Sequence, residues 1–381
     1  MRDSVLSLAH PFTLAQSGIF MAQDLQGTII LFTLFDVCDE INLKELQRLI
    51  GGTPVAPALK HAAPEHVRFE RSPVIEALPL VTIPTGEKFA ATLQYYDYGV
   101  VSLLLRFTFC GSWQRLQQLA GNWISSSAFD DLSRQVVRQK LPDISSALVN
   151  RYEKWLTEDY CVVHLHAVPG IENGAELLNR HGAEISQIVR GETLPLAEFE
   201  RKEVLQAFMS YYPNDLIVVG WNAAFLFDSE AGAEATIRLL EYANSQLLQF
   251  RHYDDLLTHE LADVYRFLER RRGLIAGWRM RPAASRLRTV LLDVTELTER
   301  TNNALKFVGD MFSARLYKLC AARIGVSDYQ SLVEEKLRTA DELYDFMIEQ
   351  FHQARGFLLE FIVVLILIIE LFFLFHGPAK S

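Results

Sequence analysis

The residues that could do chemistry are few, and one group of them lies on a single helical face. His252, Asp255 and His259 are spaced i, i+3 and i+7, so a helix places all three on the same side. Imidazole and carboxylate groups in this arrangement can ligate a metal ion. A solvated face explains the same residues, because the charged Asp254 and Glu260 lie beside them. We predict no metal site and keep these three residues as candidate ligands.

Known catalytic signatures are absent from the sequence. It contains no GxxxxGK[ST], GxGxxG, HExxH or GxSxG motif. We therefore predict no enzymatic activity, no catalytic residues and no cofactor. The formal net charge of −10 gives the chain no basic footprint of the kind that nucleic-acid binders need, so no direct nucleic-acid binding is expected.

One dense basic patch stands out in this acidic chain. Seven arginines surround Leu274, Ile275 and a tryptophan between two long helical segments. Arginines near anionic headgroups and an interfacial tryptophan are typical of a loop that contacts lipid. The alternative is a solvated hairpin tip that pairs with acidic residues of the first domain. The candidate lipid-interface residues are Arg270, Arg271, Arg272, Trp278, Arg279, Arg281, Arg286 and Arg288.

Residues 357–375 form the most apolar run of the chain. An apolar helix of this length fits the hydrocarbon core of a bilayer, which is about 30 Å thick. We expect a single-pass, tail-anchored membrane protein with a short tail over 376–381 and membrane lipids among its partners. The bulk of the chain is expected to face the cytoplasm or an equivalent reducing compartment, since the four cysteines form no CxxC pair.

Two glutamates interrupt this predicted span. Glu360 and Glu370 lie about 80° apart on a helix and away from the most apolar stripe. Carboxylates inside a bilayer are costly, so one reading is an intramembrane contact with another copy or a partner. The other reading is two side chains that extend to the headgroups without a partner.

The first part of the chain alternates strand-like and helix-like patterns, which predicts an α+β fold whose sheet could be mixed. We expect an α+β domain over residues 1–230, with a possible split near residue 150. The expected strands are 28–35, 74–83, 89–96, 99–109, 160–166, 216–219 and 223–227, and the expected helices are 42–50, 113–123, 130–148 and 175–189.

Long helices replace the alternating pattern after residue 230. Residues 233–272 and 283–324 read as two helices, and a third begins near Ser327, whose S-x-x-Q spacing is that of a capping box. The 3,4 spacing of apolar residues predicts a long antiparallel, coiled-coil-like stalk over 231–356, with a hairpin tip at 273–282. The third helix and the apolar run should form one rod of about 50 residues.

Three stretches together carry a resemblance to a known family. They are Tyr96 to Val101, the segment Leu239 to Leu248 with Arg251 and Tyr253-Asp254-Asp255 after it, and the run Leu359 to Glu370. Their order and content resemble the "required for meiotic nuclear division" family, and a distant or bacterial-type member fits best. The resemblance implies an α/β domain, long helices, membrane association and assembly in place of catalysis.

These patterns favour one function and leave two alternatives. The favoured function is a non-enzymatic, membrane-anchored scaffold or tether that forms homo-oligomers through its helical stalk and presents its α+β domain to a cytoplasmic protein partner. The first alternative is an ion channel or transporter with the architecture of the magnesium transporters. The second is a membrane-bound, metal-dependent hydrolase.

Overall fold

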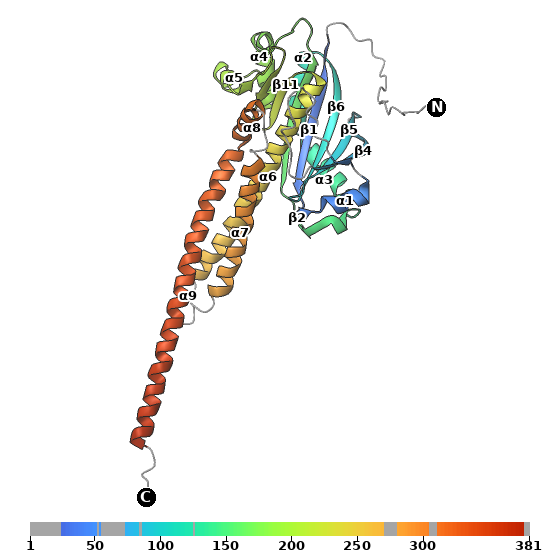
Figure 1. Ribbon diagram of the computed structural model, residues 1–381. Helices are drawn as coiled ribbons and strands as arrows, with labels where there is room; N and C mark the ends of the chain where they lie inside the picture. The colour runs from blue at the N-terminus through green and yellow to red at the C-terminus, as the bar shows by residue number, and fades with distance from the viewer. Residues whose placement is uncertain are drawn as a thin grey trace, which may run out of the picture.

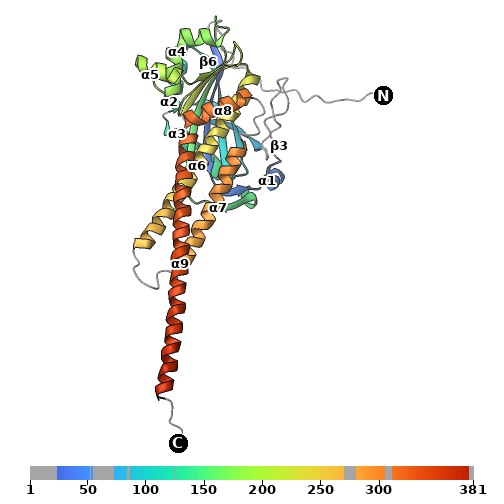
Figure 2. The same cartoon turned by 60° about the vertical axis from the view of Figure 1, so that its left-hand side comes forward.

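The protein combines an N-terminal sheet domain with a C-terminal helical region (Figure 1). The computed structural model describes residues 24–51, 53–54, 73–83, 86–124, 126–269, 280–304 and 311–376. The sheet domain has helices on both faces, and the last helix runs far beyond it, as a second view confirms (Figure 2). The α+β class and the order of the two regions are as the sequence predicts.

The main sheet of the described residues has nine strands in the order β3-β4-β5-β6-β1-β8-β11-β10-β9. Neighbouring strands are antiparallel except for β8 and β11, which are parallel, so the sheet is mixed. Strands β2 (Cys38–Ile41) and β7 (Leu148–Arg151) form a separate small sheet. The main strands are β1 Leu25–Asp36, β3 Thr53–Pro54, β4 Val74–Thr82, β5 Lys88–Tyr95, β6 Val100–Gly111, β8 Thr157–Ala167, β9 Phe208–Met209, β10 Leu216–Val219 and β11 Ala223–Phe227.

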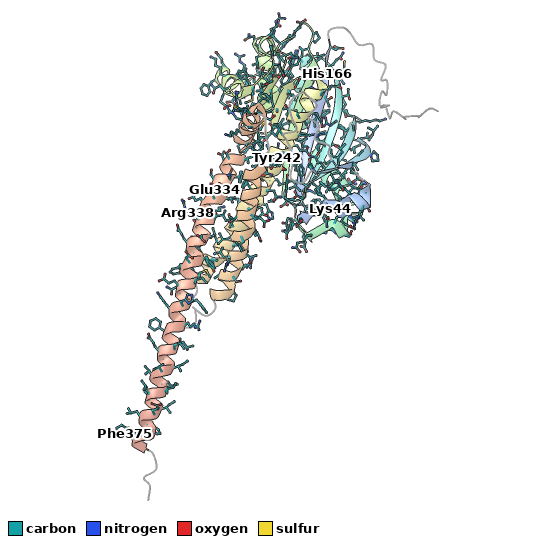
Figure 3. All side chains as sticks on the ribbon, in the orientation of Figure 1. Lys44, His166, Tyr242, Glu334, Arg338 and Phe375 are labelled. Carbon is teal, nitrogen blue, oxygen red and sulfur yellow. The ribbon has the colours of Figure 1, made fainter. Side chains whose placement is uncertain are left out.

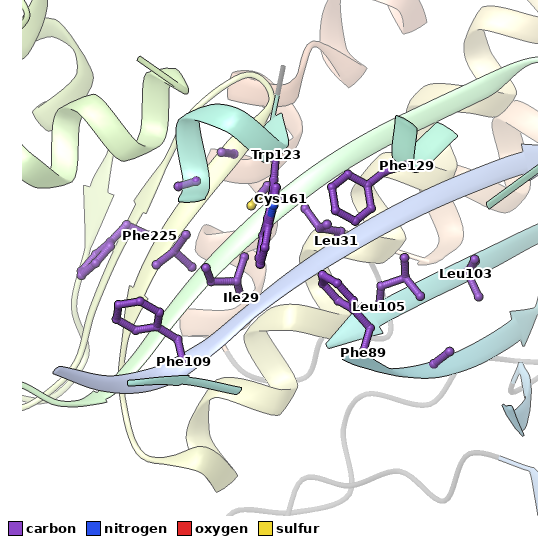
Figure 4. Close-up of a cluster of buried hydrophobic side chains, with 14 of the residues drawn as sticks. Ile29, Leu31, Phe89, Leu103, Leu105, Phe109, Trp123, Phe129, Cys161 and Phe225 are labelled. Carbon is purple, nitrogen blue, oxygen red and sulfur yellow. The ribbon is translucent and has the colours of Figure 1, made fainter. Parts of the chain in front are cut away.

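Strand β1 lies at the centre of the sheet and is buried on both faces. Alternate side chains of a strand point to opposite sides. Ile29 and Leu31 therefore join the core beneath α2, α3 and α4, where Trp123 and Phe129 pack (Figure 4). The intervening residues, such as Phe32, join a second core beneath α6 and α8. This double burial explains why β1 is a nearly continuous apolar run.

The helices fall into three groups. Helix α1 lies beside the small sheet, helices α2 to α5 belong to one side of the main sheet, and α6 to α9 form the other side and the helical region (Figure 1). Their bounds are α1 Leu43–Ile50, α2 Trp113–Ile124, α3 Ser127–Lys140, α4 Gly174–Arg190, α5 Glu198–Leu205, α6 Glu230–Glu269, α7 Met280–Ala304, α8 Met311–Ile324 and α9 Val326–His376, with a 3-10 turn at Ser145–Ala147.

Two predicted helices differ from the structure. The helix expected over 130–148 ends at Lys140, because Pro142 lacks a backbone N–H and restricts the residue before it. The helix expected over 283–324 is described as two helices, α7 and α8. The third long helix is the rod that the sequence predicts: α9 continues for 51 residues, and Gly325, with φ +96°, separates it from α8.

The predicted transmembrane helix over 357–375 is wrong. In the ranges that the structure describes, no helix combines the length and the apolar character needed to cross a bilayer. Glu360 and Glu370 divide the apolar run of α9, so its longest uninterrupted stretch, Phe361–Ile369, is far shorter than the roughly 20 residues that a span requires. The predictions of a tail-anchored transmembrane protein and of a membrane localisation depend on this helix and are therefore wrong as well.

The turn between β5 and β6 depends on Gly99. Its φ is +86°, in the left-handed region that favours glycine. The Gly99 carbonyl accepts a hydrogen bond from Val37 N–H at 3.1 Å, which ties the turn to the end of β1. A Cβ at Gly99 would lie 1.7 Å from the Cys38 carbonyl oxygen, so the backbone itself fills the space that a side chain would need.

Replacing Gly99→Ala should lower the free energy of unfolding by roughly 3 kcal/mol or more, because both the positive φ and the clash with Cys38 oppose alanine. Gly86→Ala is the matched control: φ is +98° there, but nothing lies within 4 Å of the added Cβ. The control should lose only about 1 kcal/mol. Urea unfolding of both variants measures the difference, and equal losses would show that the close approach to Cys38 does not matter.

Candidate functional site

A stripe of polar side chains on α6 faces the sheet. Glu241, Ser245, Gln249 and His252 are spaced by four, four and three residues, so they follow one side of the helix; we call them the α6 polar stripe. Residues 239–250 are all buried, since the sheet covers one side of α6 and α8 and α9 cover another. Polar groups in such an interior need partners, and the sheet supplies them.

The middle of the stripe contacts the turn between β5 and β6. The hydroxyl groups of Ser245 and Tyr98 share a hydrogen bond of 2.7 Å. Gln249 Nε2 donates to the Tyr98 carbonyl at 3.3 Å and to Asp36 Oδ1 at 3.2 Å. One helix therefore holds both this turn and the end of β1.

The lower end of the stripe pairs a histidine with a buried carboxyl group. His252 Nδ1 lies 2.8 Å from Asp36 Oδ2, whose side chain is only 2% exposed. Burial opposes the charged imidazole, but the hydrogen bond and charge of Asp36 outweigh it, so the pKa of His252 is raised. Tyr152 stacks on the imidazole with ring centroids 5.2 Å apart, and its hydroxyl donates to Asp39.

The upper end of the stripe is the buried carboxyl of Glu241. Its surroundings are Ser102 and Tyr96, with Arg106 and Glu234 farther out; these last two form an ion pair of 3.1 Å between β6 and α6. Burial raises the pKa of Glu241 to about 7, and the contact with Ser102 and the charge of Arg106 oppose this only in part. The charge of Glu241 therefore changes near neutral pH.

The chemistry of this arrangement favours holding the helix in place. The thiol of Cys38 lies near the Asp36–His252 pair, but burial and the charge of Asp36 raise its pKa to about 12. A thiol in this state is not a nucleophile. Buried polar networks of this kind fix the relative position of packed elements.

The predicted metal ligands are not brought together. His252 turns towards Asp36, whereas His259 Nδ1 lies 3.4 Å from Asp255 Oδ1 on an exposed part of α6. The described residues include no group of three or more His, Cys, Asp or Glu side chains that could hold a metal ion. The sequence pattern missed Asp36, because this carboxylate lies more than 200 positions before its partner.

The predicted basic patch is described only in part. Residues 270–279 and the side chain of Arg281 lie outside the described residues, and Arg288 is exposed on α7. Arg286 forms an ion pair with Glu260 of α6, whose side chain is 7% exposed. This contact joins α6 and α7 within the helical region.

The predicted contact residues of the apolar run lie at the far end of α9. Glu360 and Glu370 are both exposed, as are the apolar residues around them, and Phe375 lies at the tip of the rod (Figure 3). The intramembrane setting of these glutamates is wrong, because α9 is not a membrane span. Their contact with another copy stays a prediction.

Glu241→Gln tests the electrostatics of the stripe. The folded-state pKa of about 7 lies above the ordinary 4.5, so Glu241 binds its proton more tightly when folded. Its contribution to the free energy of unfolding is therefore fully present below about pH 4.5 and is lost as the pH rises through about 7. Relative to the wild type, Glu241→Gln should gain stability at pH 8, by at most about 3 kcal/mol, and little at pH 4.

Urea unfolding between pH 4 and pH 8 measures this difference. Glu335→Gln on α9 is the matched control, since its side chain is exposed. The control should follow the wild type at every pH. If the Glu241 variant shows the same parallel behaviour, the carboxyl is not a strained buried acid.

Comparisons with known proteins place most of the sheet domain in one family. The family model for the N-terminal domain of the uncharacterised protein MJ0711 matches residues 26–234, from β1 to the first turn of α6. A curated relative, the uncharacterised protein MJ0711 of Methanocaldococcus jannaschii, is 20% identical over 187 residues, which are 49% of this chain and 57% of the relative. The match thus spans little more than half the length of that relative.

No solved structure matches this chain. Neither finding links it to the "required for meiotic nuclear division" family, so that resemblance stays a prediction. The family model, in contrast, covers more than half of the chain. The chain therefore belongs to the family of the MJ0711 N-terminal domain.

Proposed function

We propose that this protein is a non-enzymatic scaffold that self-associates through the free end of α9 and presents its sheet domain to a protein partner. The observation that carries the proposal is the exposed apolar surface of α9. From Phe357 to Phe375, the apolar side chains whose burial is described are between 40% and 79% exposed. A contiguous apolar surface of this extent is typical of an interaction site.

The helical region is built to hold this surface at a distance. Apolar residues of α6, α7 and α9 pack together, among them Leu261, Leu287 and Met347. Lys336 Nζ of α9 donates to Asp254 Oδ1 of α6 at 2.5 Å, so a charge contact joins the same helices. We propose that this packing forms a coiled-coil-like stalk, beyond which α9 extends past the other described helices (Figure 1).

The same helices connect the stalk to the sheet. Helix α6 is 40 residues long and takes part first in the sheet core and then in the stalk core. Its polar stripe fixes its position on β1 and on the β5–β6 turn. A partner bound to the sheet domain would therefore be held at a defined distance from the assembling end of α9.

The occupant that we assign to the apolar surface is a further copy of the same chain. Helices that are apolar on every side are stable when neighbouring helices cover them. Homo-oligomers are the commonest assemblies of soluble proteins. No contact among the described residues favours the transporter-like or the hydrolase alternative.

Ile366→Lys should shift the full-length protein from oligomer to monomer, because Ile366 is 50% exposed at the middle of the apolar surface and a lysine would be buried there on assembly. Leu332→Lys is the matched control: this leucine is 44% exposed on α9 but lies within the stalk, outside the proposed contact. Light scattering after size-exclusion chromatography, in buffer without detergent, measures the mass.

The control should keep the mass of the wild-type oligomer. A wild-type protein that stays monomeric at micromolar concentration would contradict the scaffold proposal. So would a monomer that sediments with phosphatidylcholine vesicles, because lipid would then be the occupant of the apolar surface.

A further inference from the structure

One face of α9 carries a charge at each end and apolar residues between them. At 100° per residue, Arg355, Leu359, Ile362, Ile366 and Glu370 lie within about 80° of one another. Each of these side chains is exposed. Because the two charges are opposite, two copies of this face complement each other only when their helices run antiparallel.

We propose that two copies pair antiparallel along this face, with Arg355 of each copy beside Glu370 of the other. The proposal rests on self-association through α9 and specifies its geometry. A two-fold axis between Ile362 and Val363 places position i opposite position 725 − i, so that Leu359 meets Ile366. Two ion pairs then flank an apolar contact about 22 Å long.

A parallel pair lacks this complementarity. It would place Arg355 beside Arg355 and Glu370 beside Glu370, and like charges at one level repel. Glu360 does not change the comparison, since it lies about 140° from Arg355 around the helix and faces away from the contact.

The length of free helix agrees with the antiparallel overlap. The stalk core of α6, α7 and α9 extends along α9 to Met347 and Ile348. In the proposed pair, Phe375 of one copy lies opposite Gln350 of the other, just past this core. Among the described residues, the segment of α9 that the second copy covers is largely exposed, and the two sheet domains lie at opposite ends of the pair.

Charge reversal distinguishes the two directions. In the antiparallel pair, Arg355→Glu or Glu370→Arg alone turns both ion pairs into repulsions, and each should weaken association by about tenfold or more. The double variant restores opposite charges and should recover most of the wild-type affinity. In a parallel pair, residue 355 meets residue 355 and residue 370 meets residue 370, so like charges still meet in each single variant. The affinity would then neither fall in the single variants nor recover in the double variant.

Sedimentation velocity of the full-length variants over a concentration series measures the dissociation constant. Glu360→Arg is the control, because it changes the net charge by the same amount as Glu370→Arg but on another side of α9; it should bind like the wild type. Circular dichroism checks that each variant keeps its helices.

Single variants that assemble as well as the wild type would overturn the antiparallel pair but leave the scaffold proposal intact. The same holds for a double variant that stays as weak as the single variants. A wild-type protein that never assembles would overturn both.

Discussion

The structure depends on the burial of helix α6 on every side. Its residues 239–250 are enclosed between the sheet and helices α8 and α9, so one helix belongs to two cores at once. If α6 slid along the sheet, its polar stripe would lose its partners and the rest of the helical region would shift with it. The sheet domain and the helical region thus share one continuous helix.

The polar stripe sets this position at a cost in electrostatic energy. Apolar contacts such as Leu240 and Leu247 against the sheet supply the burial energy, but they are non-directional and tolerate sliding. The Gln249 hydrogen bonds and the Asp36–His252 pair have one geometry only. Glu241 shows the cost, since burial raises its pKa to about 7. Buried polar groups therefore trade some stability for a unique register.

Local patterns were sufficient to predict most of the sheet domain. The apolar run of β1 and the helical spacing of α1 and α2 are local signals, and the structure has each of these elements. The short strands β2, β3, β7 and β9 were missed, because none of them has the continuous apolar run of four residues that marks β10. Their pairing depends on distant segments of the chain.

The candidate site was predicted less well, for two physical reasons. The spacing of His252, Asp255 and His259 placed them on one helical face, but spacing cannot show that Asp36 binds the first of them. The hydropathy of the apolar end of α9 predicts a membrane span, but Glu360 and Glu370 lie within it and the described helix does not qualify as one. Because α9 extends past its neighbours (Figure 2), we propose instead that Glu370 pairs with Arg355 of a second copy.

In the proposed pair, α9 holds two copies together with their sheet domains far apart. Small-angle X-ray scattering of the full-length protein measures this separation. Residues 326 of the two copies would lie about 110 Å apart in the antiparallel pair, at 1.5 Å per residue along α9. The antiparallel pair should give a two-lobed distance distribution with its second maximum near or beyond this separation. A single-lobed distribution with the mass of one chain would rule the pair out.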